Sequence, residues 1–61
     1  MNRIKELREE KGMNQKELAK LTRISAPFLC DLERNRRGAK PETLQRIASV
    51  LGSNVSELME G

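Results

Sequence analysis

Apolar residues recur three and four positions apart along most of the chain, in short segments separated by glycine, proline and asparagine. That spacing places them on one face of an α-helix. No segment alternates apolar and polar residues over the length of a strand. The pattern therefore predicts an all-α domain of five short helices, joined by the short connections that are typical of compact helical domains.

The first helix is expected over residues 2–11, ending before Gly12, and the second begins at Asn14. Asn14 and Glu17 have the spacing of a capping box, in which each side chain bonds the backbone N–H of the other residue. The side chains predicted to face the core are Ile4 and Leu7 in the first helix and Leu18, Ala19 and Leu21 in the second.

Residues 22–24 are interpreted as a break before a third helix that begins at Ser25. Serine is a preferred N-cap residue, and Pro27 would fall in the first helical turn, where its missing N–H costs nothing. Asn35 is the expected end of this helix, because asparagine is the second choice after glycine for a left-handed C-terminal residue.

The fourth helix begins at Pro41 after a loop over residues 36–40, and Gly52 ends it. Asn54 and Glu57 repeat the capping-box spacing and predict a short last helix. The apolar residues expected on these two helices are Leu44, Ile47, Ala48 and Leu51, followed by Val55, Leu58 and Met59.

The size and composition of the chain argue against enzymatic chemistry. Its 61 residues predict one domain over residues 1–61, and so small a domain leaves little room for an enclosed substrate site beside its core. It contains no histidine, the usual general base at neutral pH, and a single cysteine, Cys30, which cannot form a zinc site alone. We expect no catalytic residues, no metal, no cofactor and no small-molecule site.

The longest unbroken apolar run has three residues, at 28–30, so the sequence predicts no membrane span and no signal peptide. A reduced, cytoplasmic protein is the expectation. The net charge of +3 is only a weak indication of a nucleic-acid partner. Its placement is more informative, because residues 26–33 sum to −2 whereas residues 34–46 sum to +4.

Residues 15–33 have the pattern of two short helices that cross closely around a tight turn. A small residue, Ala19, stands where a larger side chain would push the helices apart. This is the geometry of a helix-turn-helix, in which the second helix can enter the major groove of DNA.

The run NQKELAKLTRISAPFLCDLERNRR resembles the helix-turn-helix of the Cro and phage-repressor-type, or XRE-like, family, and so do PETLQRIASVLG and the following NVSEL. The resemblance extends over residues 4–58. It implies a lambda-repressor-like five-helix fold and a transcriptional regulator that binds double-stranded DNA at specific sequences. A repressor is the favoured kind of regulator. When bound to DNA, the protein would be located at the nucleoid.

The resemblance also implies which residues contact the DNA backbone. Gln15 matches a family glutamine that lies against a phosphate, and a helix N-terminus independently favours an anion there. The residues predicted to contact phosphates are Asn14, Gln15, Lys16, Arg23, Arg36, Arg37 and Lys40. Such contacts give affinity and register but carry no sequence information.

Ser25 matches a family residue at the start of the recognition helix, and a helical wheel places five more residues on its outer face. The residues predicted to face the bases are Ser25, Ala26, Pro27, Cys30, Asp31 and Arg34. Ala26 and Pro27 can contact a thymine methyl group, and Asp31 can accept from a cytosine amino group. Alternatively, Asp31 pairs with Arg34 or Arg23. The face departs from the commoner family pattern of Gln, Ser, Arg or Thr.

Arg8 and Glu33 match a buried ion pair of the family that connects the first and third helices, and we predict that pair here. Phe28 is expected at the core or its edge. Arg23 stands where glycine is common, and a left-handed backbone there would cost about 1 kcal/mol. Three apolar residues of the last helix are expected to seal the core and are also predicted as possible dimer contacts: Val55, Leu58 and Met59.

The leading hypothesis is a homodimer on a pseudo-palindromic operator, with half-sites about one helical turn apart. The competing hypothesis is a helix-turn-helix scaffold that serves as a protein-interaction module or an antitoxin component. The small, partly apolar and acidic outer face of the third helix is the feature that favours this alternative.

Overall fold

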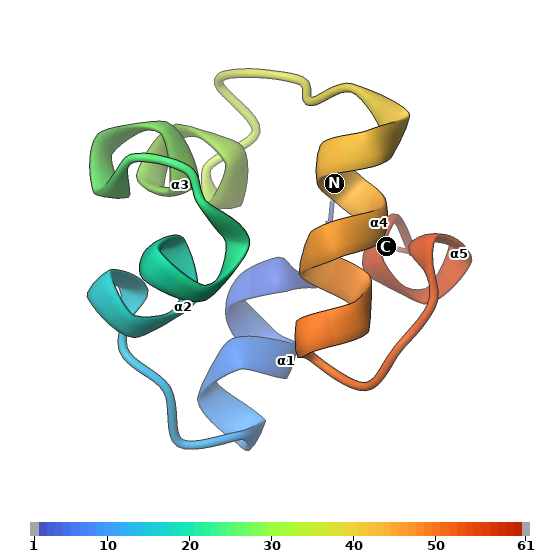
Figure 1. The fold of residues 1–61 in the computed structure, drawn as a ribbon. Coiled ribbons are helices and arrows are strands. Elements are labelled where there is room, and N and C mark those ends of the chain that lie inside the picture. The colour runs from blue at the N-terminus through green and yellow to red at the C-terminus, as the bar shows by residue number, and fades with distance from the viewer. Residues whose placement is uncertain (1, 61) are drawn as a thin grey trace.

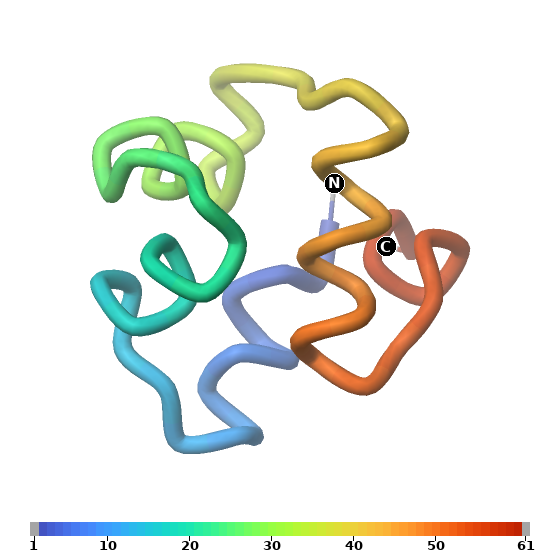
Figure 2. Tube along the Cα trace, viewed as in Figure 1, coloured from blue at the N-terminus to red at the C-terminus, as the bar shows by residue number. Residues whose placement is uncertain are grey.

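The computed structural model describes residues 2–60. Within them the chain forms five helices and no strand, as the hydrophobic pattern predicts (Figure 1). The helices are α1 (Ile4–Glu10), α2 (Gln15–Thr22), α3 (Ala26–Glu33), α4 (Pro41–Val50) and α5 (Val55–Leu58). Helix α3 lies above α2 at one side of the view, and α4 and α5 form the other side, as the chain trace also shows (Figure 2).

Three of the five helices, α2, α3 and α5, begin with side-chain caps at the predicted residues. Asn14 Oδ1 accepts from the Glu17 backbone N–H at 2.8 Å, and Glu17 Oε1 accepts from the Asn14 N–H at 3.1 Å, so this capping box is complete. Ser25 Oγ accepts from the N–H of Phe28 at 3.2 Å. At α5, Asn54 accepts from the Glu57 N–H at 2.8 Å.

The core is formed by aliphatic side chains from all five helices. Its buried members are Ile4, Leu7, Leu18, Ala19, Leu29, Leu32, Ile47, Ala48, Leu51 and Leu58. Most of the residues predicted to face the core are therefore in it, and Leu44 is only half-buried. Burial of this set is the main contribution to folding of so small a domain.

The prediction that Leu21 faces the core is wrong, because its side chain is 56% exposed. Helix α2 continues through Thr22, which sequence analysis assigned to the break, and Thr22 is completely buried. At about 100° per residue, Thr22 lies between Leu18 and Ala19 on the wheel, whereas Leu21 lies on the far side of Leu18. Thr22 therefore takes the core position.

Burial of Thr22 is compatible with its polar groups because both are hydrogen-bonded. Its hydroxyl donates to the Leu18 carbonyl at 2.6 Å, and its own carbonyl accepts from Arg46 Nε at 3.0 Å. The second bond joins the end of α2 to α4. Buried polar groups left without partners would be destabilising.

The beginning and end of the described chain meet beside α5. The Arg3 N–H donates to the Leu58 carbonyl at 2.7 Å. Leu58 is completely buried in the core, so its assignment as a dimer contact is wrong in this structure. Val55 is half-buried against the same core, whereas Met59 is 48% exposed. The short α5 therefore covers the core. Of the three residues, Met59 is the one with an exposed side chain.

Candidate nucleic-acid interface

A tight turn sets the angle between α2 and α3. Arg23 has a left-handed backbone, with φ of 61°, which is the conformation that sequence analysis considered for this residue. The Ile24 N–H donates to the Ala19 carbonyl at 3.0 Å, and the Arg23 N–H donates to the Lys20 carbonyl at 3.3 Å. These two bonds form a Schellman motif, which ends α2 and turns the chain directly into α3.

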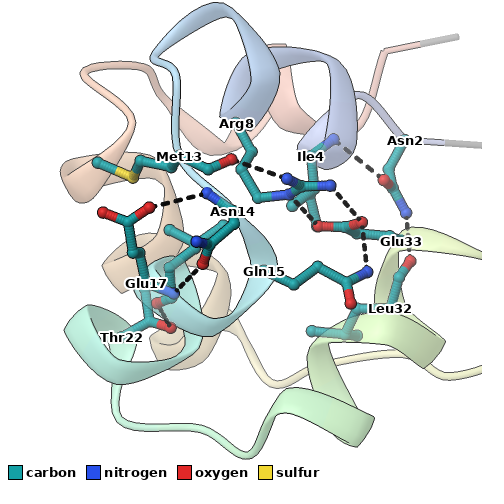
Figure 3. Close-up of polar contacts among 11 residues, drawn as sticks. Asn2, Ile4, Arg8, Met13, Asn14, Gln15, Glu17, Thr22, Leu32 and Glu33 are labelled. Atoms are coloured by element: carbon teal, nitrogen blue, oxygen red, sulfur yellow. Dashed lines mark hydrogen bonds and ion pairs between the residues drawn. The ribbon is translucent and has the colours of Figure 1, made fainter.

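The ion pair predicted between Arg8 and Glu33 is present and buried (Figure 3). Arg8 Nε lies 2.8 Å from Glu33 Oε2, and Arg8 Nη2 lies 3.2 Å from Oε1, so the contact is bidentate. The two side chains are only 9% and 2% exposed. Arg8 also donates to the Met13 carbonyl at 2.8 Å. The pair therefore fixes α3 against α1 and the connection that follows it.

The hydrogen bond with Glu33 raises the pKa of the Arg8 guanidinium above its ordinary value, although burial acts in the opposite direction. A charge-assisted bidentate contact is among the stronger hydrogen-bonding arrangements in proteins. The contact with Glu33 therefore favours the charged form of Arg8.

Gln15 joins the same network at the first residue of α2. Its amide Nε2 donates to Glu33 Oε1 at 2.9 Å (Figure 3). The family resemblance implied a phosphate contact but did not indicate this bond. Because an amide nitrogen carries two N–H groups, a second donor remains while Glu33 fixes the direction of the side chain.

The outer face of α3 combines exposed and half-buried residues. Pro27 and Arg34 are exposed, and Cys30 and Asp31 are half-buried. Ser25 is exposed, but its hydroxyl is already used as the helix cap. Ala26 is half-buried against the core. Of the six residues predicted to face the bases, Ala26 is thus the one packed against the core.

Asp31 pairs with neither Arg34 nor Arg23 in the structure. Its Oδ2 lies 3.9 Å from Arg37 Nε instead. The Arg37 guanidinium also lies over the ring of Phe28, at 5.4 Å from the ring centroid. Phe28 is half-buried at the edge of the core, as predicted. The two predicted alternatives flank α3 at its ends, whereas the observed partner comes from the loop after α3.

The other residues predicted to contact phosphates are all exposed. They are Asn14, Lys16 and Arg23 around α2, and Arg36 and Lys40 in the loop between α3 and α4. Asn14 already caps α2 through its side-chain oxygen. The structure thus brings Gln15 and Arg37 against α3 and leaves the remaining basic side chains in solvent.

Sequence reasoning missed two residues that position α3 and α2. Asn2 Nδ2 donates to the Leu32 carbonyl at 2.8 Å and to Asn35 Oδ1 at 3.0 Å, which connects the chain start to the end of α3. Sequence analysis treated Arg46 only as one charge of the basic segment 34–46, yet its Nε donates to the Thr22 carbonyl at the end of α2. A local signal could have identified Asn2, because an Asn can bond the backbone N–H two residues on, and its Oδ1 accepts from the Ile4 N–H at the start of α1. No local signal identifies Arg46.

Residues 2–60 contain no detectable pocket and no group of three or more His, Cys, Asp or Glu side chains that could hold a metal ion. None of the helices in this part of the chain is long and apolar enough to cross a membrane.

A family model described as helix-turn-helix matches residues 4–58. The chain belongs to this helix-turn-helix family. The range agrees with the extent of the predicted resemblance to Cro and phage-repressor-type proteins.

Two curated relatives of this helix-turn-helix domain are named as regulators. The chain is 48% identical over 59 residues to the HTH-type transcriptional regulator DdrOP3 of Deinococcus deserti, covering 97% of the chain and 46% of the relative. It is 37% identical over 57 residues to the immunity repressor protein of Bacillus phage phi105, covering 93% of the chain and 40% of the relative. The chain thus spans less than half the length of either relative.

Two solved structures have the same helix arrangement. The N-terminal DNA binding domain of SinR from Bacillus subtilis superposes with a TM-score of 0.87 at 32% identity, over 97% of this chain and 87% of that one. The clp gene regulator ClgR from Corynebacterium glutamicum gives a TM-score of 0.83 at 34% identity, over 87% of this chain and 56% of that one. The five-helix helix-turn-helix fold is therefore confirmed.

Proposed function

We propose that this helix-turn-helix domain binds double-stranded DNA in a sequence-specific manner and regulates transcription, acting as a repressor. Helix α3 enters the major groove. Gln15 and the basic residues of the loop at 36–40 hold the phosphates on either side. A regulator of this kind works in the cytoplasm, at the nucleoid.

The observation that carries the proposal is the open outer face of α3 between these anchors. Pro27 and Arg34 are exposed there, while Glu33 on the inner side is held by Arg8 and Gln15. A helix whose inner face is held by the rest of the domain and whose outer face is exposed can insert into the major groove. The names of the relatives, a transcriptional regulator and a phage repressor, and the likeness to the SinR DNA binding domain support the same function.

We propose further that the domain acts as a homodimer on a pseudo-palindromic operator. Two copies of a helix-turn-helix domain read half-sites about one helical turn apart. Met59, which is largely exposed at the end of α5, is the residue of the predicted dimer set that remains available for such a contact.

Selection of bound duplexes from a random pool, at two salt concentrations, tests the function directly. We expect one enriched motif with two related halves, and an affinity that falls steeply with salt because bound phosphates release counterions. Sequencing the selected pool gives the symmetry and spacing of the site together. Recovery of no preferred sequence and no salt dependence would reject the proposal in favour of a protein-interaction module.

A matched pair of variants shows whether the proposed face reads the bases. Arg34→Ala should relax the preference at one base pair, by about 1–3 kcal/mol of discrimination if Arg34 contacts a base edge. Lys11→Ala removes the same charge at the end of α1, where the lysine side chain lies near Gly52 and outside the set of residues proposed to contact DNA. It should leave the motif and the affinity nearly unchanged.

A further inference from the structure

Helix α3 is acidic, although it is the helix proposed to approach a polyanion. Residues 26–33 carry two carboxylates and no basic side chain. Unpaired carboxylates beside phosphates would weaken binding. In the structure each carboxylate instead faces a nitrogen donor from another part of the chain: Glu33 contacts Arg8 and Gln15, and Asp31 contacts Arg37.

The two carboxylates lie on nearly opposite sides of the helix. At about 100° per residue, Asp31 and Glu33 are separated by about 200°, and Phe28 lies on the same side as Asp31. Pro27 and Arg34 occupy the outer face between them. Helix α3 therefore has Gln15 along one flank and Arg37 along the other.

The backbone explains why Arg37 reaches this position. Asn35 has a left-handed backbone, with φ of 59°. The Arg36 N–H donates to the Asp31 carbonyl at 2.9 Å, and the Asn35 N–H donates to the Leu32 carbonyl at 3.1 Å, which is a second Schellman motif. The motif turns the chain back along α3, so Arg37 lies beside Phe28 and Asp31.

We propose that Asp31 and Phe28 orient Arg37 as a phosphate clamp on the flank of α3 opposite Gln15. This inference rests on the proposed DNA-binding function and assigns Asp31 a positioning role within it. The two flanking donors then contact the two backbones that border the major groove. A side chain held in its binding direction loses less conformational freedom when the phosphate arrives.

The contact geometry fits orientation better than competition. Asp31 faces the Nε of Arg37, and neither terminal nitrogen of Arg37 has a hydrogen-bond or ion-pair partner within residues 2–60. A guanidinium offers five N–H donors in a planar fork, so its outer edge can bind a phosphate while Nε stays near Asp31. The pair is 60% and 40% exposed, and such a contact is weak enough to adjust.

A double-mutant cycle on DNA binding tests the assignment, with the full chain and the selected duplex. In the parent protein, Arg37→Gln should lower the affinity about tenfold, the size of one charge-assisted hydrogen bond. It should also reduce the slope of log affinity against log salt by about 0.9. In the Asp31→Asn background, the same substitution should cost only about two- to threefold, because Arg37 is no longer oriented there.

Arg36→Gln is the matched control, because Arg36 is an exposed neighbour for which the structure gives no side-chain partner within residues 2–60. Its effect should be the same with and without Asp31→Asn. An equal loss for Arg37→Gln in both backgrounds would overturn the inference. A larger loss in the Asp31→Asn background would also overturn it, because Asp31 would then compete with the phosphate.

A measurement without DNA separates this inference from the function on which it rests. In NMR spectra, the side-chain protons of Arg37 should show an upfield ring-current shift that Phe28→Leu removes and Asp31→Asn reduces. Absence of that shift would overturn the orientation of Arg37. If the shift is present but the protein selects no duplex, the proposed function fails; if it selects a duplex and the cycle shows no coupling, only the clamp fails.

Discussion

Each flank of α3 carries one carboxylate that contacts a nitrogen donor from another part of the chain, but the two contacts differ in burial. On the flank that faces α1 and α2, Glu33 is almost completely buried and bonds both Arg8 and Gln15. On the flank that faces the loop, Asp31 and Arg37 are both substantially exposed, and their charged atoms are 3.9 Å apart. The side chain of one carboxylate is thus buried, and that of the other lies at the surface.

Because of this difference in burial, the two ion pairs should contribute very differently to the free energy of unfolding. Removing one partner of a buried ion pair leaves an uncompensated charge and costs about 3–5 kcal/mol, whereas an exposed pair contributes about 0.2–1 kcal/mol. A domain of this length has a total stability of about 3–9 kcal/mol. The buried flank therefore determines whether α3 is held in place, and the exposed flank can change its contacts without unfolding the protein.

Breaking the buried flank should have the largest effect. Glu33→Gln should lower the free energy of unfolding by about 2–3 kcal/mol, below the usual range for an unpaired buried charge because the glutamine carbonyl can still accept one bond from Arg8. Urea titration followed by the helical circular dichroism signal measures this loss, since the chain has no Trp or Tyr for fluorescence.

Glu9→Gln is the matched control for that loss, because Glu9 is an exposed carboxylate on α1. It should change the free energy of unfolding by less than about 0.5 kcal/mol. Equal stability of the two variants would show that the buried pair does not hold α3 in place.

Gln15→Ala should have a smaller effect on stability and a distinctive effect on DNA binding. Loss of the bond to Glu33 should lower the free energy of unfolding by about 1 kcal/mol. The affinity for the selected duplex should fall while the salt slope stays constant, because a neutral amide displaces no counterion. Gln45→Ala, at an exposed position on α4, should change neither quantity. A reduced salt slope for Gln15→Ala would contradict a neutral phosphate contact.

Local sequence signals predicted the helix starts and ends well. Asn14 and Ser25 cap their helices as expected, Asn54 forms one of the two bonds of its predicted capping box, and Asn35 has the left-handed backbone that its place after α3 predicted. Each of these features depends on a few neighbouring residues. Local chemistry is therefore sufficient to set them, whatever the rest of the fold does.

Features that depend on distant contacts were predicted less well. Thr22 was assigned to a break, and local sequence gave no sign of its carbonyl partner, Arg46, which lies 24 positions away. Leu58 was expected to seal the core and was also named as a possible dimer contact, because apolar spacing does not show which side of a four-residue helix meets the core. Asp31 was given Arg34 or Arg23 as alternative partners, and Arg37 was missed because the sequence does not show how the loop after α3 places its side chains.

Asp31→Asn should hardly change stability, in contrast to Glu33→Gln. Because the Asp31–Arg37 pair is exposed, we expect a change of less than about 0.5 kcal/mol in the free energy of unfolding. The same urea titration measures it, and adding salt should reduce the difference further because exposed pairs are screened. A loss greater than about 1 kcal/mol would show that the loop flank also supports the core.

The smallest expected effect is that of a change in pH near neutrality on the stability that the buried Arg8–Glu33 pair contributes. The pKa of Arg8 is raised by its hydrogen bond with Glu33, so its contribution is fully present below the unfolded-state pKa and is lost only as pH rises through the higher folded-state value. Both lie far above neutrality, and the chain has no histidine. The stability difference between the parent and a double variant that removes both partners, Arg8→Met with Glu33→Met, should therefore be constant from about pH 6 to pH 9. A difference that shrinks across this interval would mean that Arg8 loses its proton there, which the buried bidentate contact with Glu33 opposes.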